Sequence, residues 1–229
     1  MKGYKYILFC LPALLYMACD SNSIEDYELG AKLNFYSYRT VNNVPEKLCS
    51  YSDEDYVKGV TEKLDSVRVD IMGVAQDENR TFYCKVDFKA DEPHMQILLE
   101  EQYVMPSERY STFIKFKILP PPAFEIRHLT NISFDYSRIT EDFTPGLTEL
   151  QTCIVRCTYR IRPDVWHNSV WGDYSNGKYK FMMDKFKDVY GNIKRTAANL
   201  TYIKKQYEEY RKNNPPILDD QYPPQEIKF

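Results

Sequence analysis

Six stretches in the middle of the chain alternate between hydrophobic and polar residues with a period of two. Alternate side chains of a strand point to opposite faces, so each stretch predicts a strand with one buried and one solvated face. No strong helical pattern separates them, which favours a mainly β fold, an antiparallel sandwich over residues 31–162. The six stretches are residues 33–36, 66–71, 81–88, 113–118, 131–136 and 152–162.

We expect this sandwich to be of the Ig-like or Calx-β-like type, and the pattern changes after it, at Pro163. Hydrophobic residues recur at spacings of three and four over residues 179–190 and again over residues 200–210. This spacing places them on one face of a helix. We therefore predict a small C-terminal helical region within residues 163–229.

Two details refine the C-terminal prediction. The Asn176–Gly177 pair before Lys178 is typical of a turn rather than of a helix start. The last residues, 219–229, are rich in proline and acidic side chains, and we expect them to form an extended tail over the domain.

The N-terminus has the pattern of an export signal. Lys2 and Lys5 precede a charge-free run, residues 6–18, that is too short to span a bilayer as a helix. Ala18 directly precedes Cys19, which resembles a bacterial lipobox. We expect residues 1–18 to be a signal peptide and Cys19 to carry the lipid. The alternative is an ordinary signal peptide cleaved near Ala18, which leaves Cys19 as a plain thiol.

The segment that follows, residues 19–30, is expected to be the lipidated N-terminus and a tether. Its residues 20–28 are polar and acidic and have no hydrophobic period, as in a solvated linker. They are also similar to the acidic stretch that directs Bacteroidetes lipoproteins to the outer face of the cell. We therefore expect a lipid-anchored protein of the outer membrane, exposed on the cell surface.

Composition and charge exclude several functions. The 30 Lys and Arg residues against 33 Asp and Glu residues give a formal net charge of −3, which does not supply the basic surface that nucleic-acid binding needs. His94, His128 and His167 lack the spacing of metal ligands, and no nucleophile or phosphate-loop motif occurs. Acidic pairs such as Asp219 and Asp220 are more typical of solvated loops than of glycosidase carboxylates. We expect no enzymatic activity, no catalytic residue, no metal and no cofactor.

Four cysteines other than Cys19 belong to the predicted mature chain. Cys84, Cys153 and Cys157 fall on the hydrophobic side of predicted strands, and Cys49 lies in a polar segment. Cys153 and Cys157 are four residues apart in one strand, about 13 Å, and cannot bridge. Free thiols that pack as small hydrophobic groups are the favoured state, although an exported protein could pair four cysteines in three ways.

Aromatic residues are the remaining functional hint, with 20 Tyr, 12 Phe and 2 Trp. Exposed Tyr and Trp side chains stack on sugars, hold peptides and are favoured at protein interfaces. Among those outside the clear hydrophobic faces, Trp166 and Trp171 are our candidate ligand-binding residues. The full set is Tyr36, Tyr38, Tyr51, Tyr56, Tyr83, Trp166 and Trp171.

Several short motifs resemble an uncharacterised family of Bacteroidetes surface lipoproteins, a domain of unknown function. Its members are often encoded beside SusC/SusD-like outer-membrane transporters. The resemblance implies a surface lipoprotein of a nutrient-uptake locus and assigns no catalytic residue. Its motifs are the lipobox, Met72–Gly73, residues 143–146, Pro163–Trp166, Trp171–Ser175, Lys178–Met182 and Pro216–Asp220.

Three functions therefore stay open. The first is a non-catalytic accessory protein docked on a SusC/SusD-like transporter, which helps to capture or hand over an oligosaccharide or a peptide. The second is a lipoprotein that binds glycan or peptide ligands independently. The third is a purely structural lipoprotein of the envelope.

Overall fold

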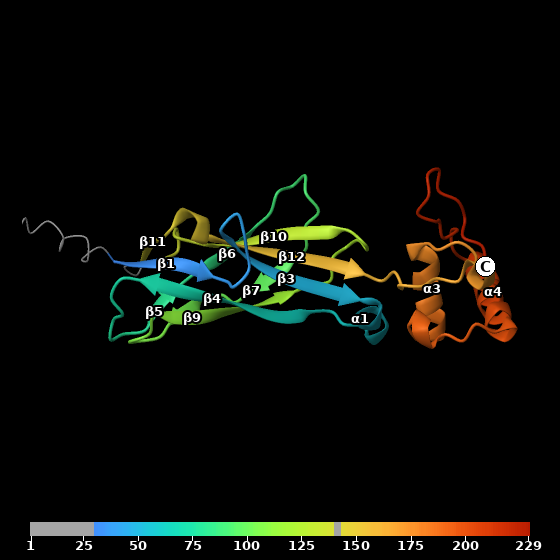
Figure 1. Ribbon diagram of the computed structural model, residues 1–229, viewed down its shortest axis with the longest axis horizontal. Helices are drawn as coiled ribbons and strands as arrows, with labels where there is room; N and C mark the ends of the chain where they lie inside the picture. Colours follow the sequence, from blue (N-terminus) through green and yellow to red (C-terminus); the bar gives the residue numbers. More distant parts are fainter. Residues whose placement is uncertain (1–29, 140–142) are drawn as a thin grey trace, which may run out of the picture.

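The computed structural model describes residues 30–139 and 143–229. The predicted signal peptide (1–18), the lipidated Cys19 and all but the last residue of the tether (19–30) lie outside these residues. A β-sandwich forms most of the described structure, and residues 163–229, here called the helical cap, lie at one end of it (Figure 1).

The predicted β-sandwich is confirmed: two five-stranded sheets pack face to face. The first has the strand order β11-β1-β4-β9-β7, and its strands are β1 (Ala31–Tyr36), β4 (Lys63–Met72), β7 (Ile97–Leu99), β9 (Ser111–Ile118) and β11 (Phe143–Pro145). The second has the order β2-β3-β12-β10-β6, with β2 (Thr40–Val41), β3 (Val44–Ser52), β6 (Cys84–Asp87), β10 (Arg127–Phe134) and β12 (Thr152–Arg160). A separate pair joins β5 (Arg80–Phe82) to β8 (Tyr103–Met105).

Neighbouring strands are antiparallel, as predicted, except in two places. β1 pairs with β11 and β3 pairs with β12 in parallel. A parallel pair needs a long crossover, and most of the sandwich lies between β3 and β12 in the chain. Neither β3 nor β11 is among the strands predicted from the alternation, so these two pairings could not be anticipated.

The core consists of the hydrophobic positions of the alternating stretches. Leu33 and Phe35 of β1 and Ile114 of β9 are completely buried. Phe35 stacks on Phe134 of β10 with ring centroids 4.1 Å apart, which joins the two sheets. The predicted run 81–88 is broken into two strands, because β5 pairs with β8 whereas β6 pairs with β10.

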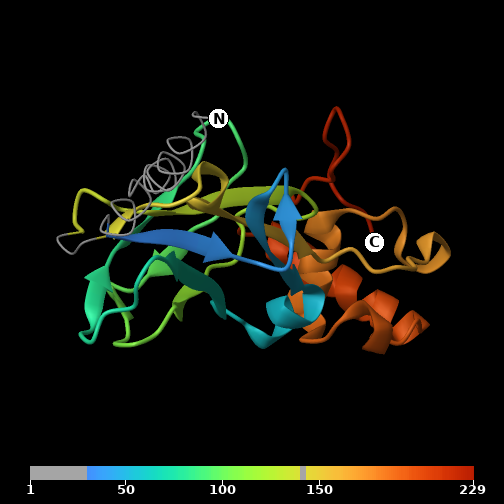
Figure 2. The ribbon, with the colours of Figure 1, turned by 60° about the vertical axis from the view of Figure 1, so that its left-hand side comes forward.

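The predicted C-terminal helices are present, and the sandwich has one short α-helix of its own. The cap contains α2 (Asn168–Trp171), α3 (Asn176–Phe186), the 3₁₀ turn η3 (Tyr190–Asn192) and α4 (Ala197–Arg211). The sandwich itself carries α1 (Asp53–Lys58) and the 3₁₀ turn η2 (Thr148–Leu150). Figure 2 shows α1 at the end of the sandwich that faces the cap. The Tyr56 hydroxyl of α1 donates a 2.9 Å hydrogen bond to Asp184 of α3.

The turn predicted at Asn176–Gly177 is wrong, because α3 begins there. Ser175 caps the helix, and its hydroxyl accepts the Lys178 N–H at 3.1 Å. A Cβ on Gly177 would lie 2.7 Å from Ile217 Cγ2. The glycine therefore leaves room for the C-terminal tail to pack against the first turn of α3.

The tail doubles back on itself instead of lying extended. Leu218 and Glu226 form an isolated antiparallel bridge. The Asp219 carboxylate closes the loop by accepting the backbone N–H groups of Gln221 and Gln225. This return places the Phe229 ring against α3 and α4, where it contacts Phe181 and Tyr207.

Candidate ligand-binding site

The two predicted tryptophans have different environments. Trp171 is completely buried (0% exposed), so the proposal that it contacts a ligand is wrong. It ends α2 and packs toward Phe186 of α3, which makes it part of the core of the cap. Trp166 is half-buried, and its indole Nε1 donates a 2.7 Å hydrogen bond to the Gly172 carbonyl oxygen.

Trp166 is the centre of an aromatic cluster in the cap. Its ring stacks on Tyr190 with centroids 4.9 Å apart and an interplanar angle of 26°. Tyr174 and Tyr179 meet it edge-on, at 5.2 and 6.0 Å. Burial of the Tyr179 hydroxyl, together with its hydrogen bond to Asp53, raises its pKa, so it stays protonated and acts as a donor.

A buried lysine fixes the loop beneath this cluster. The Lys178 ammonium donates to the carbonyl oxygens of Trp171 and Asp173, at 3.0 and 2.6 Å. Burial lowers the pKa of Lys178. Both acceptors are backbone groups of the α2–α3 connection, so the lysine has a structural role in holding this loop.

The functional groups of the cluster lie around the Tyr190 hydroxyl. This oxygen accepts the backbone N–H of His167 at 2.8 Å, and the His167 ring Nδ1 lies 2.8 Å from it. Arg195 Nη1 lies against the same imidazole, in contact with Nε2 and 3.1 Å from Nδ1. These contacts join three parts of the chain: His167 in the segment after β12, Tyr190 in η3 and Arg195 just before α4.

The protonation state of His167 follows from the groups that donate hydrogen bonds to it. A guanidinium has no acceptor, so Arg195 donates to the imidazole, and Nε2 is the nearer of the two ring nitrogens. We accordingly assign the ring proton to Nδ1, which donates to the Tyr190 oxygen. Tyr190 then accepts two hydrogen bonds, and within residues 30–139 and 143–229 no side chain or carbonyl accepts its own proton. Tyr190 itself is buried, with 8% of its surface exposed.

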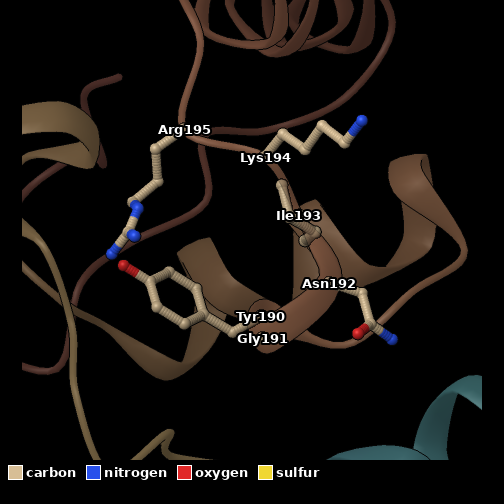
Figure 3. Close-up of a pocket in the computed structure, with 6 residues that line it drawn as sticks. All are labelled: Tyr190, Gly191, Asn192, Ile193, Lys194 and Arg195. Carbon is tan, nitrogen blue, oxygen red and sulfur yellow. The ribbon is translucent and has the colours of Figure 1, made fainter.

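Beside the hydroxyl lies a pocket of about 440 Å³, formed by the six residues from Tyr190 to Arg195. In Figure 3 the Tyr190 hydroxyl points toward the Arg195 guanidinium, and Lys194 extends from the same segment. Lys194 and Arg195 are exposed, so their charged ends are open to solvent. The Asn192 amide is held by Asp188 at 2.7 Å. The pocket is consequently rich in hydrogen-bond donors and in positive charge.

Sequence reasoning identified only part of this site. Trp166 was a candidate, whereas His167 was interpreted as an isolated polar residue and Tyr190 as part of a helical stripe. The turn at η3 brings Tyr190 and Arg195 to His167, and no spacing in the sequence shows that approach. The proximity of a basic pair, Lys194–Arg195, to an aromatic residue is the signal that could have found it.

The other aromatic candidates are scattered. Tyr38 is 96% exposed and Tyr36 is also exposed, with the two rings 5.4 Å apart. Tyr51 is buried between the sheets, where its hydroxyl donates to the Ile118 carbonyl oxygen. Tyr56 and Tyr83 are half-buried. Only Tyr36 and Tyr38 therefore add to the exposed aromatic surface.

Two features are absent from the part of the chain that the structure describes. Within them, no three His, Cys, Asp or Glu side chains come together in a way that could hold a metal ion. No helix of the same residues is both long and apolar enough to cross a membrane.

Comparisons with solved structures show likeness of fold alone. A protein of unknown function from Bacteroides ovatus is 8% identical, with a TM-score of 0.40, over 60% of this chain and 47% of that one. The Calx CBD1 domain in its apo form is 9% identical, with a TM-score of 0.38, over 57% of this chain and 97% of the domain. The chain thus spans about half of the Bacteroides protein.

Sequence comparison is more specific. No curated protein matches the chain significantly. A family profile described as Domain of unknown function (DUF4843) matches residues 37–187, from the loop after β1 to the end of α3. This range is well over half of the 229 residues and includes Trp166 and His167. The predicted resemblance to a family of unknown function is thereby confirmed at that level, and the chain belongs to the DUF4843 family.

Proposed function

We propose that the protein is a lipid-anchored, non-catalytic accessory of a SusC/SusD-like nutrient-uptake system, and that it captures acidic oligosaccharides at the cell surface. The observation that carries this proposal is the donor arrangement at Tyr190 and Arg195. Tyr190, Lys194 and Arg195 line one pocket, and the Tyr190 hydroxyl faces the Arg195 guanidinium (Figure 3).

The chemistry of the pocket favours a carboxylate on the ligand. Arg195 uses Nη1 on His167, and its remaining N–H groups match a carboxylate in a two-point arrangement. The Tyr190 proton would donate to the same group or to a neighbouring hydroxyl. Lys194 adds a second positive charge. A uronic acid unit of an oligosaccharide combines a carboxylate, hydroxyls and an apolar ring face suited to aromatic neighbours.

Anchoring and location rest on the sequence. The Ala18–Cys19 junction after a charge-free run supports lipidation at Cys19, and the acidic residues 20–28 support display on the cell surface. A lipidated cysteine confines the domain to the membrane plane, which raises its effective concentration beside other membrane proteins. Even a weak contact with a transporter would then be occupied.

Binding can be measured with a tetramer of galacturonic acid as the probe and maltotetraose as its neutral counterpart. We expect the acidic tetramer to change the fluorescence of Trp166 and the neutral one to have no effect. Arg195→Gln should weaken binding about tenfold or more, because a charged hydrogen bond is lost. Lys205→Gln is the matched control, since Lys205 is an exposed cation on α4 that does not line the pocket.

Three results would contradict this ligand class. Equal binding of both tetramers would show that charge is not recognised. Equal affinity of the Arg195 and Lys205 variants would place the site elsewhere. Binding of acidic peptides in preference to the sugar would turn the assignment toward peptide capture. The unfolding midpoint of each variant verifies that it is folded.

The anchor has an independent test. Intact mass of the chain extracted from membranes should show cleavage before Cys19 and the added acyl mass. Cys19→Ala should leave the protein unprocessed or soluble. A mature chain with an unmodified Cys19 would reject the lipoprotein assignment without bearing on the ligand pocket.

Association with a transporter is favoured by one separate observation. Tyr36, Tyr38 and Phe113 are exposed on the first sheet and the loop after β1. Affinity purification of the tagged protein from mildly solubilised outer membranes should recover a SusC/SusD-like partner, and Tyr38→Ser with Phe113→Ser should lose it. Recovery of the protein alone, together with binding of the acidic tetramer, would instead favour an independent binding lipoprotein. Recovery alone with no ligand would favour a structural role.

A further inference from the structure

Cys49 and Cys157 are direct neighbours on adjacent strands of the second sheet. They are Cα partners in the parallel pair β3–β12. Two residues further along both strands, Tyr51 and Tyr159 are also partners, and their rings lie 5.3 Å apart. This agreement of register shows that the side chains of Cys49 and Cys157 project from the same face of the sheet.

The separation suits a disulfide. Neighbouring strands are about 4.8 Å apart, and disulfides join Cα atoms that lie about 4.4–6.8 Å apart. The proximity of Cys157 is also the main physical cause of the lowered Cys49 pKa. Both are present as free thiols in the structure.

Among the residues that the structure describes, the other two cysteines, Cys84 and Cys153, have no such partner. Cys84 is the neighbour of Phe134 on β10, and Cys153 is the neighbour of Ile132 on the same strand. Because β10 lies between β6 and β12, Cys84 and Cys153 are two strand spacings apart, roughly 10 Å across the sheet, and their partners on β10 are two residues apart along the strand. They are therefore internal controls for any oxidation of the folded protein.

The two thiols of the pair differ in reactivity. Cys49 is half-buried, and its pKa is lowered by the hydrogen bond from Cys157 and by the positive charge of Lys63, against the opposing effect of burial. Cys157 is completely buried, and its hydrogen bond to Cys49 together with burial raises its pKa. An accessible thiolate attacks first in thiol–disulfide exchange, so Cys49 is the entry point.

We propose that Cys49 and Cys157 form an oxidisable dithiol, which closes to a disulfide between β3 and β12 when the folded protein meets a disulfide oxidant. The Cys49 thiolate attacks one sulfur of the oxidant and releases one thiol. Cys157 then attacks the Cys49 sulfur of the mixed disulfide and releases the second thiol. One S–S bond forms and another breaks, two electrons pass to the oxidant, and the two cysteine protons leave on the released thiols.

The position of the pair gives the bond a structural consequence. β3 runs directly into α1, which contacts the helical cap through Tyr56 and Asp53. The two cysteines are 108 residues apart in the sequence. A crosslink over so long a loop restricts the unfolded chain strongly, and a rise of about 5–10 °C in the unfolding midpoint is expected.

The test incubates the folded full-length chain with oxidised glutathione, then denatures it in N-ethylmaleimide and maps the peptides by mass spectrometry. We expect one linked peptide pair that contains Cys49 and Cys157, two hydrogens lighter than the separate peptides, with Cys84 and Cys153 alkylated. The midpoint should rise for the wild type and for Cys153→Ser, and should not respond to oxidant in Cys49→Ser or Cys157→Ser.

Two outcomes would overturn the proposal. One is N-ethylmaleimide on both Cys49 and Cys157 after oxidation. The other is glutathione retained on Cys49 with Cys157 still alkylated, which would mean that the second attack fails in the folded protein. Because the unlinked wild type is compared with its own oxidised form, a variant that folds poorly does not decide the result.

Discussion

The Tyr179 hydroxyl of α3 donates a 2.7 Å hydrogen bond to the Asp53 carboxylate of α1 and so joins the helical cap to the sandwich. The same oxygen accepts the Tyr190 backbone N–H at 2.8 Å. Tyr179 is completely buried, Tyr190 is also buried, and Asp53 is half-buried. One side chain therefore fixes the orientation of the cap and the position of η3, where the candidate site lies.

Tyr179→Phe should loosen this junction. The substitution keeps the ring but leaves the Asp53 carboxylate without its donor and the Tyr190 N–H without its acceptor. We expect a loss of about 2–3 kcal/mol in the free energy of unfolding, because a buried group is left unsatisfied. Urea unfolding followed by circular dichroism measures it. Tyr202→Phe is the control, since its hydroxyl bonds to Lys185 at the surface, and it should change stability by less than about 0.5 kcal/mol. Equal losses in both variants would contradict the assigned role.

Gly177→Ala should destabilise the protein even though alanine is the better helix former. Alanine in a helix gains up to about 1 kcal/mol over glycine. Here its Cβ would lie 2.7 Å from Ile217 Cγ2 and 3.0 Å from the Leu218 carbonyl oxygen, so the tail must shift. We expect a net loss of about 1–2 kcal/mol, measured by thermal unfolding. Gly191→Ala is the comparison, because nothing lies within 4 Å of its Cβ, and a larger loss there would refute this explanation.

The fold could be predicted from the sequence wherever the hydrophobic side chains are the buried ones. β3 is a strand in which they are not. In this strand Glu46 is buried and Leu48 is exposed, which inverts the usual pattern. Lys47 approaches Asp65 of β4 as an ion pair at 3.0 Å. Because charge pairing rather than side-chain hydrophobicity decides burial here, the alternation is lost from the sequence, and with it the parallel pairing to β12.

The candidate site was predictable only through Trp166. Its other members depend on where α3 ends, since Lys187 in the left-handed conformation (φ 55°) turns the chain toward η3. Trp171 was misassigned because a tryptophan beside polar residues resembles an exposed one, whereas α2 rotates it into the core of the cap. Such contacts arise from helix ends and loops, which carry no periodic signal.

Stability should fall as the pH drops below about 6.5, with His128 as one cause. This histidine is 1% exposed, and burial lowers its pKa. A folded pKa below the unfolded value of about 6.5 means that the unfolded state binds protons first, so stability is full above pH 6.5 and declines below it. His128→Gln should flatten this decline between pH 6.5 and 5, a range in which most carboxylates stay ionised. Unfolding midpoints in urea at several pH values measure the slope. A wild-type slope in His128→Gln would contradict this assignment.

Glu46 is the residue at which loss of charge should lower the free energy of unfolding most. It is 2% exposed, and its carboxylate lies between Arg39 Nε at 2.5 Å and the Arg156 guanidinium. Glu46→Gln removes the only negative charge of the trio and leaves Arg156, which is mostly buried, without its counter-ion. Breaking a buried pair from one side costs about 3–5 kcal/mol, and we expect a loss of this order in urea unfolding.

The matched control for Glu46 is an exposed ion pair of the same type. Glu54→Gln breaks the Lys58 pair on α1, where both side chains are largely in water, and should cost less than about 1 kcal/mol. A double variant, Glu46→Leu with Arg156→Met, replaces the buried charges with apolar side chains of similar size and should recover much of the loss. If the double variant is as unstable as Glu46→Gln, the cost comes from packing of the Glu46 side chain and not from an unpaired buried charge.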